Sequence, residues 1–266
     1  MGTAFDVGQV RVTELILGSV GHPRVLSSPR NQIRGMFGNA VALLEDLDGD
    51  GALEVLVGAS GEGRAYVVDG ARNEVRAVVE PSEPSEGFGR GVLALCDVDG
   101  DGLGDFAVWG GSAGPVSTVG VYSSATAARL HTIESPGGGL RFSTSLALMP
   151  DLDGDGTCDL LVGATSVEDA YVFSGSDGGL IRVFESPDVR AYGRSVAPIG
   201  DLDGDGLAEV AAGAPCHHGG GSVYVFSGGT GALLMDLRPQ WGGLSHGFGS
   251  AVLSPGDLDG DGVPDL

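Results

Sequence analysis

Acidic side chains recur at fixed spacing in five nine-residue segments, and this pattern is the feature of the sequence best suited to chemistry. The segments are residues 46–54, 97–105, 151–159, 201–209 and 257–265. Each has Asp at positions 1, 3 and 5, Asp or Glu at position 9, and Gly at positions 4 and 6. Carboxylate oxygens at this spacing, together with the backbone carbonyl of position 7, form the kind of cage that binds calcium. The glycines allow the positive φ angles that such a tight loop requires.

These segments predict the binding of up to five calcium ions. Two carboxylates about 5 Å apart repel by roughly 3 kcal/mol at an effective dielectric constant of 20, so four of them in nine residues need a counter-ion. Magnesium suits the loop less well because it keeps several waters in strict octahedral geometry. The alternative is that the segments are only acidic turns between strands. The predicted metal ligands are Asp46, Asp48, Asp50, Ala52, Glu54, Asp97, Asp99, Asp101, Leu103, Asp105, Asp151, Asp153, Asp155, Thr157, Asp159, Asp201, Asp203, Asp205, Leu207, Glu209, Asp257, Asp259, Asp261, Val263 and Asp265.

The overall composition excludes several classes of function. The chain has 266 residues and a formal net charge of −22, from 36 acidic residues and 14 basic residues that are all Arg. This charge excludes the binding of nucleic acid through a basic surface. The sequence has no run of about 18 uncharged apolar residues, so we expect no insertion into a membrane. With 49 Gly and 13 Pro, the chain is too rich in turn residues for a helical protein.

The acidic segments recur with a period of about 53 residues, which is typical of propeller blades. Between them, apolar and polar residues alternate with a period of two, which indicates strands. In the first repeat we expect strands at residues 39–44, 54–59, 64–68 and 74–79. Four short strands cannot enclose a core alone, but sheets arranged around an axis can bury their faces against one another. The predicted fold class is therefore all-β, a β-propeller of four-stranded antiparallel blades with five blade motifs.

Short motifs on either side of the acidic segments carry a resemblance to a known family. An aromatic residue followed by Gly or Ser precedes each segment, at Phe37-Gly38, Phe88-Gly89, Phe142-Ser143, Tyr192-Gly193 and Phe248-Gly249. Gly-Ala and a small residue follow three of the segments, at residues 58–60, 163–165 and 213–215. Over nearly its whole length the chain resembles the FG-GAP repeat of the integrin α-subunit β-propeller and its bacterial relatives. The resemblance implies calcium in the loop between the first two strands of a blade, and protein recognition or adhesion at one propeller face.

The repeats predict one β-propeller domain over residues 1–266. We expect blades at residues 37–87, 88–141, 142–191 and 192–247, and partial blades at residues 1–36 and 248–266. The number of blades stays open between two alternatives. In one, the two partial blades combine and close a five-bladed ring. In the other, which we favour, the chain is a fragment of a longer seven-bladed secreted propeller, because the fifth motif stops at Leu266, where its second strand should begin.

The predicted function is that of a calcium-binding, non-enzymatic module for recognition or adhesion, outside the cell or at the cell surface. We expect no catalytic residue, because the sequence offers no base or nucleophile beside the ligands. The partner is expected to be another protein or a glycan bound at one propeller face. Two alternatives stay open: a carbohydrate-binding lectin of the same fold, and an accessory domain of a larger secreted enzyme. The chain shows no signal peptide, so the extracellular location requires a leader upstream of residue 1.

Two further motifs are weaker candidates for chemistry. Residues 110–114 match the Gly-x-Ser-x-Gly pattern of hydrolase nucleophiles, but no helical pattern follows them, as that elbow requires. Cys216-His217-His218 has side chains that ligate soft metals, but the sequence offers no second cluster to complete the site. We interpret both motifs as turns.

Overall fold

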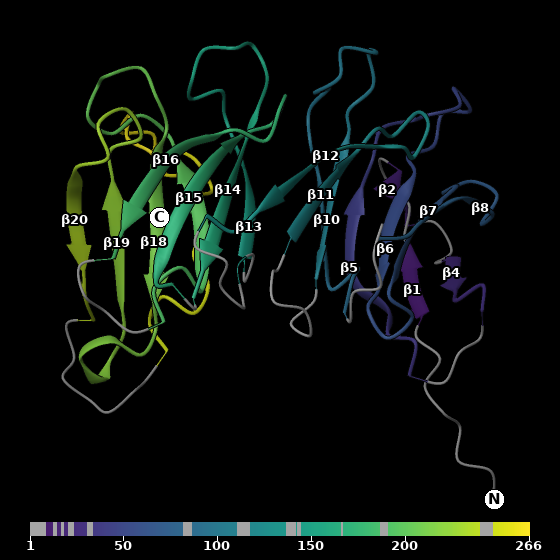
Figure 1. Cartoon of the computed structure of the whole chain (residues 1–266), viewed down its shortest axis with the longest axis horizontal. Helices are drawn as coiled ribbons and strands as arrows, with labels where there is room; N and C mark the ends of the chain where they lie inside the picture. The colour runs from purple at the N-terminus through teal and green to yellow at the C-terminus, as the bar shows by residue number, and fades with distance from the viewer. Residues whose placement is uncertain are drawn as a thin grey trace, which may run out of the picture. The chain divides into compact units, whose positions relative to one another are not determined.

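The computed structural model shows an all-β chain, which confirms the predicted fold class (Figure 1). The chain divides into two compact units, residues 1–114 with 119–130, and residues 115–118 with 131–266. Within the described residues, helical structure is limited to one 3-10 turn, η1 (His217–Gly219), and none of it is long and apolar enough to cross a membrane. The structure describes residues 9–12, 15–16, 19–20, 24–30, 34–81, 87–110, 118–136, 142, 145–165, 167–186, 191–239 and 247–266.

The first unit is built around two four-stranded antiparallel sheets, which we call blades 1 and 2. Blade 1 has the strand order β5 (Phe37–Leu43), β6 (Val55–Ala59), β7 (Arg64–Val68) and β8 (Val75–Val79). These bounds match the four strands expected in the first repeat to within two residues. Blade 2 contains β9 (Gly91–Ala94), β10 (Phe106–Gly110), β11 (Thr118–Tyr122) and β12 (Arg129–Glu134), and β12 continues into the second unit. Two short pairs precede them, β1 (Gln9–Val12) with β4 (Arg24–Ser27) and β2 (Leu15–Ile16) with β3 (Ser19–Val20).

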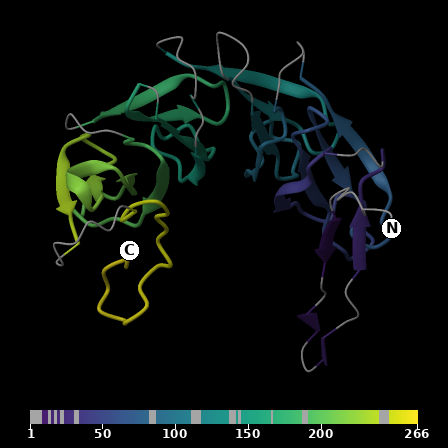
Figure 2. The same cartoon turned by 90° about the horizontal axis from the view of Figure 1, so that it is seen from below.

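The second unit contains blades 3 and 4, which have the same strand order as blade 1. Blade 3 consists of β13 (Ser145–Met149), β14 (Asp159–Ala164), β15 (Asp169–Ser174) and β16 (Leu180–Glu185). Blade 4 consists of β17 (Ser195–Ile199), β18 (Glu209–Ala214), β19 (Ser222–Phe226) and β20 (Leu233–Leu237). Residues 247–266, yellow in Figure 2, follow as a loop without a strand and form isolated bridges, such as the one between Gly256 and Asp265. The single domain over 1–266 and the number of blades stay predictions.

The hydrophobic core lies between adjacent blades of each unit. The second strand of every blade is an almost continuous run of small and branched apolar residues, and nearly all of it is buried, as in β6. Such runs are typical of strands covered on both faces. One cluster packs Leu56 of blade 1 against Phe106 of blade 2, and another packs Leu161 of blade 3 against Tyr224 of blade 4. The fourth strands lie at an edge of each sheet and are mostly exposed, with one buried side chain near the end of β8, β12 and β16.

The aromatic-Gly motifs join each repeat to the one before it within a unit. The carbonyl oxygen of Gly89 lies so close to Gly58 of blade 1 that a Cβ atom on Gly58 would be 2.1 Å from it. Equivalent contacts join Gly163 to Gly193 and Gly213 to Gly249. Four motif aromatics are at most 5% exposed: Phe37, Phe88, Phe142 and Tyr192. The fifth, Phe248, is 41% exposed, and Ser143 lies outside the described residues.

Four of the five acidic segments connect the first and second strands of blades 1 to 4, and the fifth lies within residues 247–266. Because neighbouring strands are antiparallel, this first connection and the connection between the third and fourth strands lie at the same end of the sheet. In blade 1 the two connections are the loop between β5 and β6 and the turn between β7 and β8. Each blade therefore brings a second turn close to its acidic loop.

Candidate metal-binding loops

All five acidic loops share one internal hydrogen-bond framework. The position 1 carboxylate accepts the N–H groups of positions 4 and 6, at 2.6–2.9 Å. At position 3, Oδ1 accepts the N–H of position 5, at 3.0–3.2 Å. At position 5, Oδ1 accepts the N–H of position 7, at 2.8–2.9 Å. These hydrogen bonds hold the backbone of the position 7 residues. They do not use the Oδ2 atoms of positions 3 and 5.

The glycines of the loops have the conformation expected from the sequence. At positions 4 and 6 of all five loops φ lies between +74° and +94°, a region that residues with a Cβ rarely adopt. A Cβ atom at any of these glycines would have nothing within 4 Å. The backbone angle, and not a lack of space, therefore requires glycine here.

The acid at position 9 closes each loop from its far end. Its carboxylate accepts the N–H of position 2 at 2.7–2.9 Å in all five loops. In blades 1 to 4 this acid is at most 1% exposed: Glu54, Asp105, Asp159 and Glu209. Asp265 of the fifth loop is only partly buried. The apolar residue at position 2 shows the same difference, since Val98 and Leu152 are buried whereas Leu258 is 73% exposed.

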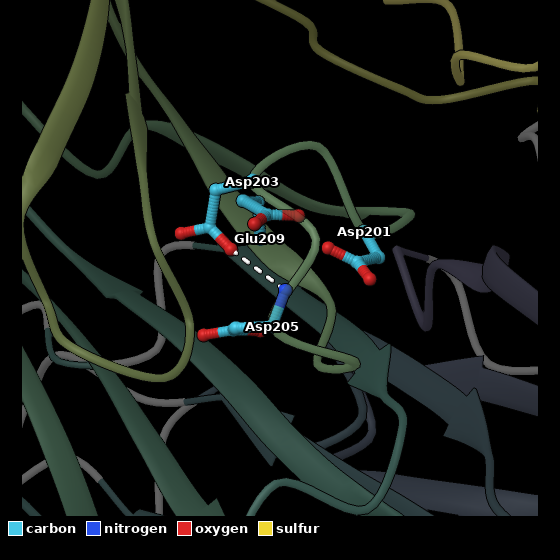
Figure 3. A group of neighbouring side chains, drawn as sticks. All are labelled: Asp201, Asp203, Asp205 and Glu209. Atoms are coloured by element: carbon cyan, nitrogen blue, oxygen red, sulfur yellow. Dashed lines mark hydrogen bonds between the residues drawn. The ribbon is translucent and has the colours of Figure 1, made fainter.

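Loop 4, residues 201–209, forms the most complete candidate site. One oxygen each of Asp201, Asp203, Asp205 and Glu209 lies within 4.8 Å of the others, and Figure 3 shows the four carboxyl groups gathered around the loop. Glu209 is fully buried, and its Oε2 atom accepts the N–H of Leu202 at 2.8 Å. Its Oε1 atom has no hydrogen-bond partner among the described residues. A buried carboxylate oxygen without a partner is costly, and a cation inside the loop would supply that partner. The donor set therefore fits a hard divalent cation.

The structure brings predicted ligands together in the other blades as well. The groups whose ligand atoms lie within 4.8 Å of one another include Asp46, Asp48 and Asp50 in blade 1, Asp97, Asp99 and Asp101 in blade 2, and Asp151, Asp153 and Asp159 in blade 3. In loop 5 the hydrogen-bond framework places Asp257, Asp259, Asp261 and Asp265 as in the other loops. Hydrogen bonds from the backbone N–H to Oδ1 of position 5 hold the position 7 residues, which are Ala52, Leu103, Thr157, Leu207 and Val263.

Burial raises the pKa of the position 9 acids in blades 2, 3 and 4. For Asp159 burial raises the pKa to about 7, although the N–H of Leu152 opposes the change, and the charge of Asp153 adds to it. Burial likewise raises the pKa of Asp105 and of Glu209. A carboxylate taken out of water beside other carboxylates is stabilised by a proton or by a cation. Without a bound ion, burial thus favours the protonated form of these position 9 carboxyl groups.

A further set of side chains, which the sequence pattern did not indicate, reaches the acidic loops from the turn between the third and fourth strands and from the strand residues beside it. In blade 1 these are Asp69, Arg72 and Arg76, and in blade 3 they are Ser174 and Ser176. The Ser176 hydroxyl donates to Asp155 at 2.6 Å and is the main cause that lowers the pKa of Asp155 to about 2. A comparison of the equivalent turns between repeats would have found them, because the antiparallel order places those turns beside the loops.

The two weaker motifs add little to the site. Cys216 is an exposed free cysteine beside η1, and His217 packs its ring against Tyr224 at a centroid distance of 6.1 Å. Residues 111–117, which hold most of the Gly-x-Ser-x-Gly motif, lie outside the described residues.

Comparison with known proteins identifies the repeats. Residues 46–108 and 201–266 match the family described as FG-GAP-like repeat. Integrin alpha-3 of Cricetulus griseus is 32% identical over 166 residues, which cover 52% of this chain and 15% of that integrin. A crystal structure of BBS1N in complex with ARL6DN, soaked with lead, has a TM-score of 0.51 at 10% identity, over 83% of this chain and 58% of that chain. At this low identity the structural likeness shows the fold alone.

The matched segments contain four of the five acidic loops. Residues 46–108 contain loops 1 and 2, and residues 201–266 contain loops 4 and 5. The matched pattern corresponds in the structure to the glycines with positive φ, the aspartates at position 1 and the Gly-Gly contacts between repeats. The chain therefore carries FG-GAP-like repeats, and it is similar to integrin alpha-3 over about half of its length.

Proposed function

We propose that this chain is a calcium-stabilised, non-enzymatic propeller module that recognises another protein outside the cell or at the cell surface. The buried Oε1 atom of Glu209, which has no hydrogen-bond partner among the described residues and lies among three further carboxylates, carries the calcium part of the proposal. A cation there would satisfy an atom that the protein leaves unsatisfied. The expected total is up to five ions, one in each acidic loop.

The donor set favours calcium over other cations. Calcium takes six to eight oxygen ligands at variable geometry, and each loop offers carboxylates at positions 1, 3, 5 and 9 with a nearby position 7 carbonyl. Magnesium demands near-ideal octahedral geometry and keeps its waters, which a loop of four carboxylates does not suit. Zinc favours nitrogen and sulfur ligands, and the groups named above are all oxygens.

The ions would have a structural role. Each loop of blades 1 to 4 leads into a buried second strand, and its position 9 acid either begins that strand or directly precedes it. A bound ion would link the end of the first strand to the start of the second. The unfolded chain lacks the preformed cage, so the free energy of ion binding would stabilise the fold. The similarity to integrin alpha-3 supports protein recognition and an extracellular location.

A calcium titration of the EDTA-treated chain tests the proposal. Isothermal titration calorimetry should show several ions bound per chain, and thermal unfolding should shift to higher temperature with calcium. Magnesium at the same concentration is the matched control and should give a much smaller shift. If neither heat of binding nor a change in melting temperature is found, the loops are only acidic turns.

The recognition part requires a separate test. The calcium-loaded chain, immobilised, is probed against a panel of extracellular proteins and against a glycan array, with the EDTA-treated chain as control. Calcium-dependent binding of a protein supports the proposal. Binding of glycans alone would support the lectin alternative instead.

A further inference from the structure

Loop 1 differs from the other acidic loops because a guanidinium group of the protein lies among its carboxylates. The Nη1 atom of Arg72 is 2.8 Å from Oδ2 of Asp48, 2.9 Å from Oδ2 of Asp50 and 2.6 Å from Oδ2 of Asp69. The first two oxygens are the ones that the shared framework leaves open at positions 3 and 5. Arg72 therefore uses the atoms that a bound ion would need.

A second arginine occupies the remaining side of the loop. The Nη1 atom of Arg76 is 2.9 Å from Oδ2 of Asp48 and 2.8 Å from Oε1 of Glu54. Glu54 and Glu209 both hold position 9, and in both the Oε2 atom accepts the N–H of position 2. Oε1 of Glu54 is paired with Arg76, whereas Oε1 of Glu209 has no partner among the described residues. The atom that points to an ion in loop 4 is already neutralised in loop 1.

The other blades lack these arginines at equivalent positions. The turns align through one hydrogen bond, in which the residue with positive φ donates its N–H to the carbonyl four residues earlier, as Asn73 does to Asp69. Arg72 then corresponds to Thr126, Asp177 and Thr230 in blades 2, 3 and 4. Arg76 corresponds to Leu130, Ile181 and Leu234, and Asp69 corresponds to Ser123, Ser174 and Ser227. Among blades 1 to 4, two arginines and an aspartate hold these three positions in blade 1 alone.

The burial of the acidic partners makes this network hard to displace. Exposed ion pairs contribute little to stability, and the Arg72 side chain is half exposed. However, the side chains of Glu54 and Asp69 are 2% and 6% exposed, so the arginines are the counter-ions of two buried acids. An ion entering loop 1 would have to break the contacts of the arginines with Glu54 and Asp69. These buried carboxylates would then need new partners, and the loss of one partner of a buried ion pair costs much stability.

We propose that Arg72 and Arg76 take the place of calcium in loop 1, so that blade 1 is held together without an ion at calcium concentrations that fill the other loops. This inference rests on the proposed function, because it compares loop 1 with loops that bind calcium. It reduces the expected number of ions from five to four. It also assigns to Asp69, Arg72 and Arg76 the role of an internal counter-ion network.

The test compares the native chain with the double variant Arg72→Thr/Arg76→Leu, which installs the residues found at these positions in blade 4. The number of ions per chain is measured by equilibrium dialysis with metal analysis. The native chain should bind four calcium ions and the variant five, with the affinity of loop 1 raised at least tenfold. Arg90→Thr/Arg129→Leu is the matched control, since both arginines are exposed and the change in net charge is the same. The control should bind four ions.

A second variant keeps the test informative if the double variant does not fold. Glu54→Gln should leave the ion count of the chain at four, because loop 1 is not filled, whereas Glu209→Gln should lower it to three. A loss of one ion in Glu54→Gln, or five ions of similar affinity in the native chain, overturns this inference and leaves the proposed function intact. An absence of calcium from every loop refutes the proposed function and this inference with it.

Discussion

Replacement of Glu209 by Gln is expected to stabilise the chain without calcium and to destabilise it with calcium. Glutamine keeps the size of the side chain, and its carbonyl oxygen can still accept the N–H of Leu202, now 2.8 Å from Oε2. The change removes the charge of a fully buried carboxylate whose acidic neighbours lie within 4.8 Å. The two conditions therefore distinguish a metal ligand from a side chain that only accepts a hydrogen bond.

The magnitude follows from the distances and the exposure of the neighbours. Two like charges about 4 Å apart repel by about 1 kcal/mol in water and by about 4 kcal/mol at an effective dielectric constant of 20. Asp201, Asp203 and Asp205 are exposed, so we take the lower figure, about 1 kcal/mol. For a domain of this size that raises the Tm without calcium by roughly 2–4 °C. At a calcium concentration a thousand times the Kd, an occupied site contributes about 4 kcal/mol. The net loss of about 3 kcal/mol then lowers the Tm by roughly 6–12 °C.

Calorimetric unfolding in EDTA and in saturating calcium measures both effects on the same protein. Glu209→Asp is the matched control, because Asp105 and Asp159 hold position 9 in blades 2 and 3. This control should keep most of the calcium-dependent rise in Tm. The reasoning is refuted if Glu209→Gln lowers the Tm equally in both conditions, since Glu209 would then be only an acceptor for Leu202.

Three further substitutions test the fold around the loops, each measured by denaturant unfolding. Gly206→Ala should cost about 1–2 kcal/mol, because φ at this residue is +89° and its Cβ atom would contact nothing. A result near zero would show that the loop relaxes. Gly213→Ala should cost at least as much, about 1–3 kcal/mol, for a different reason: its Cβ atom would lie 2.0 Å from the carbonyl oxygen of Gly249. An unchanged stability would mean that this contact opens freely. Tyr192→Phe should raise the free energy of unfolding by up to about 1 kcal/mol, because it removes a buried hydroxyl that has no partner among the described residues. A clear loss of stability would indicate a partner for that hydroxyl.

The acidic loops and most strands were predictable because the interactions that form them are local. The loop framework joins residues at most seven apart, and it depends on Asp at positions 1, 3, 5 and on glycines with positive φ. The strands of the first repeat follow from the alternation of apolar residues and from the turns between them. Both signals are present in a short window of sequence, so no knowledge of the tertiary structure is needed.

The counter-ion network of loop 1 depends on residues that are distant in the sequence, and the pattern of the acidic segments did not indicate it. Arg72 is 24 residues from Asp48, and they meet because the antiparallel order places the first and third connections of a blade together.

The acidic loops thus share one backbone conformation, but the carboxylate at position 5 has three different environments. The turn between the third and fourth strands determines which environment is present. In blade 1 a guanidinium nitrogen of Arg72 lies 2.9 Å from the carboxylate of Asp50. In blade 3 the hydroxyl of Ser176 donates to Asp155 at 2.6 Å. In blade 4 the facing residue is Gly229, where a Cβ atom would be 2.1 Å from Oδ2 of Asp205. A cation competes with calcium, a hydroxyl can turn its oxygen towards an ion, and glycine adds neither a charge nor a hydrogen bond from its side. Identical acidic motifs therefore do not imply identical sites, because the turn that faces each motif sets the charge available to an ion.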